Sequence, residues 1–144
     1  MKKQITVFII VLLTIILLKI FVITPVFVKG NSMEGTLKNG EITLLYKFGK
    51  LKRGSLVVVN VNGEKIIKRI VGLPGEKIKS VNGQIYIDDK YYNESYISSK
   101  NSDFKEVIIE KNKYFVLGDN RENSKDSREF GTIEKKQILG TIII

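Results

Sequence analysis

Two side chains in this 144-residue chain could together carry acyl-transfer chemistry. Ser32 lies in a short loop, residues 29–37, directly after a long apolar run, and its hydroxyl is a potential nucleophile. Lys68 lies in a predicted strand over residues 64–71, on the same face as Ile66 and Ile70 because side chains alternate along a strand. A lysine held among apolar groups is destabilised in its charged form, so its pKa falls and the neutral amine can act as a base.

The composition narrows the mechanisms that could operate here. The chain has no histidine and no cysteine, which excludes Ser/His/Asp and Cys/His arrangements, disulfides and cysteine zinc sites. Acid–base chemistry near neutral pH must therefore use a carboxylate, a lysine, a tyrosine or water. At a pKa of ~10.4 only about 0.04% of a lysine is neutral at pH 7, whereas at a pKa of ~8 the neutral fraction is about 10%.

Each feature also has an ordinary interpretation when it is taken alone. Gly30, Asn31 and Ser32 are turn formers, and Lys68 would be a half-exposed strand lysine beside the solvated charges Lys65 and Arg69. A third polar stretch, residues 118–131, reads as a solvated loop of Asp, Asn, Ser and Gly residues. It is long for a connecting turn, however, and offers the Ser124 hydroxyl and a potential ion pair between Asp126 and Arg128.

An N-terminal apolar run must position the Ser32 loop. Residues 5–23 are almost wholly aliphatic, and as a helix they would reach roughly 28 Å, close to the ~30 Å hydrocarbon core of a bilayer. We expect a transmembrane anchor, with the Lys19 ammonium reaching the headgroups. The alternative is a cleaved signal peptide, but no small-x-small site follows the run. Lys2 and Lys3 place residues 1–4 in the cytoplasm and residues 24–144 outside it.

Short strands separated by turns follow the run, which predicts one all-β, antiparallel domain over residues 24–144. We expect the helix to end at Thr24–Pro25 and Asn62–Gly63 to form a hairpin turn. Residues 93–103 are polar and predict an exposed excursion. The strands are predicted over residues 26–28, 41–46, 54–59, 64–71, 84–87, 107–110, 114–117 and 138–144.

The net charge of +9 indicates an anionic partner. The basic residues are scattered, with one cluster over residues 47–53, and no nucleic-acid-binding motif accompanies them. The sequence therefore favours an anionic membrane surface over nucleic acid.

Three stretches together resemble the type I signal peptidases, which are membrane-anchored Ser/Lys proteases. The matching pieces are Ser32–Met33 just after a single apolar span, residues 68–76 (KRIVGLPGE) and the loop over residues 118–131, in the same order and spacing. The resemblance covers essentially the whole chain and implies a compact antiparallel β ectodomain behind one N-terminal transmembrane helix. It implies no metal and no organic cofactor.

The resemblance also implies residue roles. Ser32 would attack the scissile carbonyl and donate its main-chain N–H to the oxyanion, Lys68 would take the serine proton, and Ser124 would orient the lysine by a hydrogen bond. Structural partners at the site would be Asp119, Asn120, Asp126 and Arg128. Substrate contacts would come from Val26, Val28, Gly30 and Met33, with the substrate added as a strand beside residues 26–28.

The implied reaction is removal of signal peptides from exported preproteins that carry small residues at the first and third positions before the cut. Two alternatives stay open: an inactive signal-peptidase-like assembly factor for surface proteins, and a self-cleaving regulator with a related Ser/Lys β-fold. The chain departs from the family at Gly35, where proline is usual, and ends at Ile144 without the family's aromatic-rich tail. We expect Gly35→Pro to raise stability or activity modestly.

Overall fold

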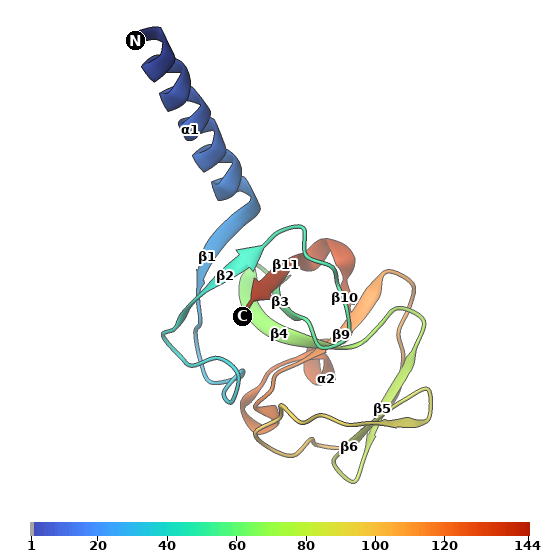
Figure 1. The fold of residues 1–144 in the computed structure, drawn as a ribbon. Helices are drawn as coiled ribbons and strands as arrows, with labels where there is room; N and C mark the ends of the chain where they lie inside the picture. The colour runs from blue at the N-terminus through green and yellow to red at the C-terminus, as the bar shows by residue number, and fades with distance from the viewer. Residues whose placement is uncertain (1) are drawn as a thin grey trace.

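The computed structural model describes residues 2–144, without the side chains of residues 2 and 18–20. The side chain of Lys19, expected at the headgroups, therefore lies outside the described part. The chain begins with a 21-residue helix, α1 (Lys2–Val22), and the first strand, β1 (Ile23–Phe27), follows without a loop. The helix thus ends two residues before the expected Thr24–Pro25, and Ile23 belongs to the sheet. In Figure 1, α1 extends away from the strands.

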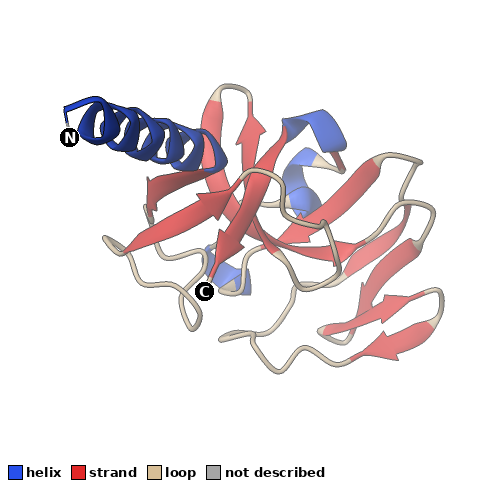
Figure 2. Ribbon diagram, turned by 45° about the horizontal axis from the view of Figure 1, so that its top comes forward, coloured by secondary structure: helices blue, strands red, loops and turns tan. Residues whose placement is uncertain are grey.

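In the described part of the chain, eleven strands form two antiparallel sheets, whose strands are drawn as red arrows in Figure 2. The seven-stranded sheet has the order β1-β2-β11-β3-β4-β9-β10, and the four-stranded sheet has the order β7-β6-β5-β8. Beyond β1 the strands are β2 (Ile42–Tyr46), β3 (Leu56–Val61), β4 (Glu64–Gly72), β5 (Lys77–Val81), β6 (Gln84–Ile87), β7 (Lys90–Tyr92), β8 (Phe104–Ile108), β9 (Lys113–Leu117), β10 (Ile133–Glu134) and β11 (Ile138–Ile143). The predicted antiparallel β class is confirmed.

Short helices follow β9 and β10 in the sequence. They are the 3₁₀ turns η1 (Arg121–Asn123) and η2 (Lys135–Gln137) and the single-turn helix α2 (Ser127–Phe130). Both η1 and α2 lie in the loop between β9 and β10, which is the polar stretch singled out in the sequence.

Tight turns set the register of the hairpins. Asn62 and Gly63 both have positive φ, 52° and 89°, as the two-residue turn that matches strand twist requires. This turn aligns β3 with β4, so that Val57 lies opposite Lys68. The expected hairpin is therefore confirmed.

The hydrophobic core has three clusters, and two of them lie on opposite faces of β4. Ile70 packs with Val57, Val59 and Val116 inside the seven-stranded sheet. Val71 instead joins Phe115 and residues of β5 and β6, which fastens the four-stranded sheet to the other face. The side chains of residues 64–71 therefore alternate between the two faces of β4, as predicted, and β4 contributes to the core on both faces.

Several strand predictions need correction. The prediction omitted β5, β7 and β10, and its strand over residues 107–110 begins three residues and ends two residues later than β8. Ile109 lies beyond the end of β8 and exchanges main-chain hydrogen bonds with Gly75 and Glu76.

Within the described part of the chain, no helix was found that is both long enough and apolar enough to cross a membrane. The span predicted over residues 5–23 is thus not confirmed by the structure.

Candidate active site

The loop that carries Ser32 is a compact turn anchored by its neighbour, Met33. The Met33 side chain is buried in the core, and its carbonyl accepts the main-chain N–H groups of Thr36 and Leu37. The Ser32 carbonyl accepts the N–H of Asn120 at 3.0 Å, which ties the turn to the loop after β9. The Ser32 hydroxyl is therefore held on a rigid support between two segments that are distant in sequence.

Lys68 meets Ser32 directly, because its Nζ atom lies 2.7 Å from Ser32 Oγ. The Lys68 residue is only 3% exposed, so the prediction of a buried lysine is confirmed and the half-exposed alternative is wrong. Burial is the main reason that the pKa of Lys68 falls to about 8, and the nearby Arg128 guanidinium contributes to the decrease. The carboxylate of Asp126 opposes this shift, as do those of Asp119 and Glu64.

The opposite face of β4 carries a buried ion pair. Arg69 was expected to be a solvated charge, but it is buried and donates to both carboxylate oxygens of Asp119, at 2.8 and 2.6 Å. Thr36 also donates to Asp119, at 2.5 Å. The network links β4, the Ser32 turn and the loop after β9 on the side of the strand away from Lys68.

Asp126 and Arg128 form the ion pair that the sequence suggested. The Arg128 guanidinium donates to both Asp126 oxygens at 2.8 Å and also to the carbonyls of Arg121 and Ser124. Asp126 in turn accepts the N–H of Gly118 at 3.1 Å. The pair therefore links Gly118, at the start of the loop, to the helix α2, near the end of the loop.

Ser124 is placed differently from the prediction. Its hydroxyl is buried and, among the described residues, has no hydrogen-bond partner, so the expected bond to Lys68 is not formed. The hydroxyl packs against Gly118: a Cβ atom at Gly118 would lie 2.1 Å from Ser124 Oγ and 2.6 Å from the Ser32 carbonyl oxygen. The missing side chain of Gly118 lets Ser124 and the Ser32 turn approach each other closely.

The expectation for Gly35 is wrong. Its φ is +99°, far from the −65° that a proline ring imposes. A Cβ atom at this position would touch the Ser98 Cβ at 3.4 Å. Glycine is thus required here by the backbone of the Ser32 turn, and the usual proline does not fit this conformation.

A groove of about 600 Å³ leads to Ser32 between β1 and the first half of β4. All four residues predicted to contact substrate line it: Val26, Val28, Gly30 and Met33. A second cavity of about 350 Å³ is lined by Ser32 and by Lys68. Ser32 therefore lines both cavities.

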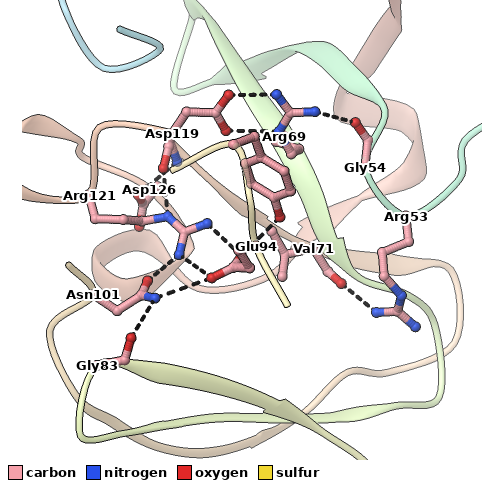
Figure 3. A network of polar contacts seen from close by, with 12 residues as sticks. Arg53, Gly54, Arg69, Val71, Gly83, Glu94, Asn101, Asp119, Arg121 and Asp126 are labelled. Atoms are coloured by element: carbon pink, nitrogen blue, oxygen red, sulfur yellow. Dashed lines mark hydrogen bonds and ion pairs between the residues drawn. The ribbon is translucent and has the colours of Figure 1, made fainter. Parts of the chain in front are cut away.

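Among the buried polar residues that the sequence analysis missed, three form a cluster. Arg121, Glu94 and Asn101 form a hydrogen-bonded cluster (Figure 3), in which Arg121 contacts both Glu94 oxygens, at 2.7 and 2.6 Å. Residues 93–103 are irregular as predicted, but Glu94 and Asn101 are buried, so the excursion is not simply exposed. The polar composition of this segment does not indicate burial, because Arg121, which pairs with buried Glu94, lies 27 residues away in the sequence.

Among the described residues, no group of three or more Asp or Glu side chains could hold a metal ion. Ser32 and Lys68 supply a hydroxyl and an amine in hydrogen-bond contact. This set is suited to nucleophilic attack and proton transfer.

The comparisons with known proteins agree with this geometry. The family model described as "Signal peptidase, peptidase S26" matches residues 1–144. Signal peptidase IB of Staphylococcus aureus is 38% identical over 146 aligned positions, which cover 85% of this chain and 76% of that protein. Signal peptidase I P of Bacillus subtilis subsp. natto is also 38% identical, covering 91% of this chain and 80% of its own length.

A solved structure shows the same fold. The crystal structure of a signal peptidase I from Enterococcus faecalis V583 superposes with a TM-score of 0.61 at 30% identity. The superposition covers 65% of this chain and 97% of that one. By its sequence and its fold, the chain belongs to the type I signal peptidases of the peptidase S26 family.

Proposed function

We propose that this protein is a membrane-bound serine endopeptidase that removes signal peptides from exported preproteins with a Ser32–Lys68 dyad. The single observation that carries the proposal is the 2.7 Å contact between Lys68 Nζ and Ser32 Oγ in a buried site. With the pKa of Lys68 lowered to about 8, roughly a tenth of the lysine is neutral at pH 7.

The reaction follows from that contact. The neutral amine of Lys68 accepts the hydroxyl proton as Ser32 Oγ attacks the scissile carbonyl carbon, which forms a tetrahedral intermediate. Collapse of the intermediate breaks the C–N bond, and the leaving amine takes the proton from the Lys68 ammonium. Water then attacks the acyl-enzyme, with Lys68 again acting as the base, and releases the signal peptide with a free carboxylate.

The main-chain N–H of Ser32 is suited to stabilise the oxyanion. Between the described residues, no hydrogen bond uses this N–H, while the Ser32 carbonyl is fixed by Asn120. A preorganised donor of this kind stabilises charge that develops in the transition state. Gly30 offers no side-chain hydroxyl, so a second donor from that position is absent.

The substrate would enter as an extended strand. β1 is an edge strand, and residues 64–68 of β4 pair only with β3, because β9 joins β4 from Arg69 onward. A peptide in the groove could therefore bond to one or both free edges, with alternate side chains pointing into it. The buried side chains of Val28 and Met33 form the floor near Ser32 and would favour small residues before the cut.

Membrane attachment through the N-terminal segment is part of the proposal. Among the described side chains of α1, the large apolar ones from Ile5 to Leu17 are 45–67% exposed. With residues 1–4 in the cytoplasm and residues 5–23 as a single-pass anchor, the β domain would lie outside the cytoplasm, where exported preproteins emerge. The basic chain would suit an anionic lipid surface.

Cleavage of a preprotein by the detergent-solubilised full chain tests the proposal. The wild type should cut at the signal-peptide junction, whereas Ser32→Ala and Lys68→Arg should lose nearly all activity. A guanidinium stays protonated and cannot accept the serine proton. Lys105→Arg, an exposed change in β8, is the matched control and should retain full activity.

The alternative of an inactive assembly factor predicts the opposite pattern, in which the wild type and Ser32→Ala are equally unable to cleave. The formed Ser32–Lys68 contact gives no support to that alternative. Cleavage that survives Ser32→Ala in pure protein would contradict the dyad.

A further inference from the structure

Glu94 and Arg121 form a buried ion pair outside the Ser32–Lys68 contact. Their side chains are 4% and 0% exposed, and two parallel hydrogen bonds join them. Tyr96 donates to one Glu94 oxygen. Asn101 donates to the other (Figure 3), so both oxygens of the carboxylate accept hydrogen bonds. Bidentate pairs of this kind fix geometry as well as charge.

The segment that carries Glu94, residues 93–103, contacts both loops of the site. The N–H of Ser98 donates to the Asp119 carbonyl at 3.2 Å, and the Ser99 hydroxyl lies 3.2 Å from both the Asn120 amide oxygen and the Glu122 N–H. The Ser32 turn passes close to the same segment, because a Cβ atom added at Gly35 would lie 3.4 Å from the Ser98 Cβ. The segment therefore lies beside both the Ser32 turn and the loop over residues 118–131, whose relative position sets the geometry of the site.

Arg121 connects Glu94 to the charged residues around Lys68 through hydrogen bonds. Its Nε donates at 2.8 Å to the carbonyl of Gly118, whose N–H in turn donates to Asp126. Arg128 donates to the Arg121 carbonyl, so Asp126 and Arg128, two of the charges nearest Lys68, are held in one network with Arg121. Hydrogen bonds therefore lead from Glu94 to Arg121, from Arg121 to the Gly118 carbonyl, and from the Gly118 N–H to Asp126.

We propose that Glu94 is a positioning residue for the cleavage reaction, acting through Arg121 to hold the 118–131 loop over Lys68 and Ser32. The proposal rests on the proposed function of the dyad. Replacing a buried ion pair by apolar groups is often neutral or favourable for stability. A contribution to stability therefore does not by itself explain why this pair is buried. Its location beside the two loops of the site is what a positioning role requires.

The test compares Glu94→Gln with Glu110→Gln in the full chain. Both changes remove one negative charge and one ion pair, but Glu110 is exposed and, among the described residues, forms its ion pair with Lys113 at the surface. The readouts are kcat and KM for preprotein cleavage, the pH dependence of kcat/KM and the thermal unfolding midpoint. Ser32→Ala is run beside them: if it still cleaves, the proposed dyad fails, and if it is inactive, the comparison judges the role of Glu94 alone.

We expect Glu94→Gln to lower kcat about tenfold or more with little change in KM, because a small misplacement of catalytic groups can cost up to ~10²-fold. Its acid limb should also move to higher pH, since a looser loop readmits water and raises the pKa of Lys68. The charged groups around that amine are Asp126, Arg128, Asp119 and Glu64. Glu110→Gln should match the wild type in both respects.

An unfolding midpoint that falls in Glu94→Gln while kcat and the pH profile stay unchanged would overturn the proposal, because the pair would then be only structural. If Glu94→Gln does not fold, Tyr96→Phe decides the question. That variant removes only the hydroxyl that donates to Glu94 and keeps the ring that lies 4.0 Å under the Arg69 guanidinium. It should shift the acid limb in the same direction by a smaller amount, and an unshifted limb would refute the positioning role.

Discussion

The Lys68 amine lies in a site that favours proton transfer at the expense of folding stability. It is buried, its strongest attractive neighbour is Asp126, and desolvation outweighs that attraction, so its pKa falls to about 8. The two isoleucines that flank Lys68 on its face of β4 allowed burial and a lowered pKa to be predicted as one of two possibilities, but they gave no indication of the Asp126 neighbour. Sequence reasoning could not predict that Ser124 lacks the expected contact with Lys68, because side-chain hydrogen bonds depend on the path of a loop.

Lys68→Met should stabilise the protein at neutral pH. In the wild type the unfolded chain still binds the lysine proton between pH 8 and about 10.5, where the folded chain has released it, so wild-type stability rises with pH across this window. Below pH 8 the charged lysine costs the folded state up to ~3 kcal/mol, which methionine avoids. Denaturant titrations at pH 7 and pH 11 measure the difference.

The stability gain of Lys68→Met should be present at pH 7 and vanish at pH 11, whereas the exposed change Lys105→Met should show no such pH dependence. A variant that is less stable than the wild type at pH 7 would show that the buried ammonium is not penalised.

Gly35→Pro should harm the enzyme, contrary to the expectation from the family pattern. A proline cannot adopt a φ of +99°, so the Ser32 turn would have to rearrange. We expect a loss of more than ~1 kcal/mol in unfolding free energy and a marked fall in kcat/KM. Gly35→Ala should be milder, at about 1–2 kcal/mol, because its strain comes from positive φ alone. A Gly35→Pro protein as stable and active as the wild type would contradict the observed turn.

At the scale of elements, the site depends on one strand and two loops. β4 presents Lys68 on one face and Arg69 on the other, which the alternation of side chains allowed us to predict. The buried state of Arg69 could not be predicted, because its partner Asp119 lies fifty residues away. Composition likewise indicated that residues 93–103 are irregular, but not that they brace the site.

Gly118→Ala should disrupt the junction of the two loops. The new methyl group would lie within 2.6 Å of both the Ser124 side chain and the Ser32 carbonyl, so one loop must move. We expect cleavage to fall by up to ~10²-fold in protein that still folds. Adding Ser124→Ala should not restore activity, because the Ser32 carbonyl remains in the way. Full activity of Gly118→Ala would show that the loops approach less closely than described.

At the scale of the whole molecule, the antiparallel class and most strands could be predicted from alternation and turn residues. The division into two sheets could not be predicted, because Val71, Phe115 and Leu117 show their shared core only in three dimensions. The omitted strands β5 and β7 are short and lie in the smaller sheet. The direction of the domain relative to a membrane remains a prediction from Lys2 and Lys3.

Protease added to intact protoplasts that express the full chain should digest residues 24–144, because the proposed orientation places the β domain outside the cytoplasm. An immunoblot against the β domain measures the loss, with a cytoplasmic protein as the control for intact membranes. Protection of the domain until the membrane is opened would reverse the proposed orientation.

The pH dependence of kcat/KM for preprotein cleavage tests the central claim most directly, because it reports the ionisation of the free enzyme's base. The chain has no histidine, so a base that titrates near neutrality must be a perturbed group. If neutral Lys68 is the base, kcat/KM should rise tenfold per pH unit on its acid limb and level off near pH 8. An acid limb that levels off near pH 4–5, as for a carboxylate base, would contradict the account.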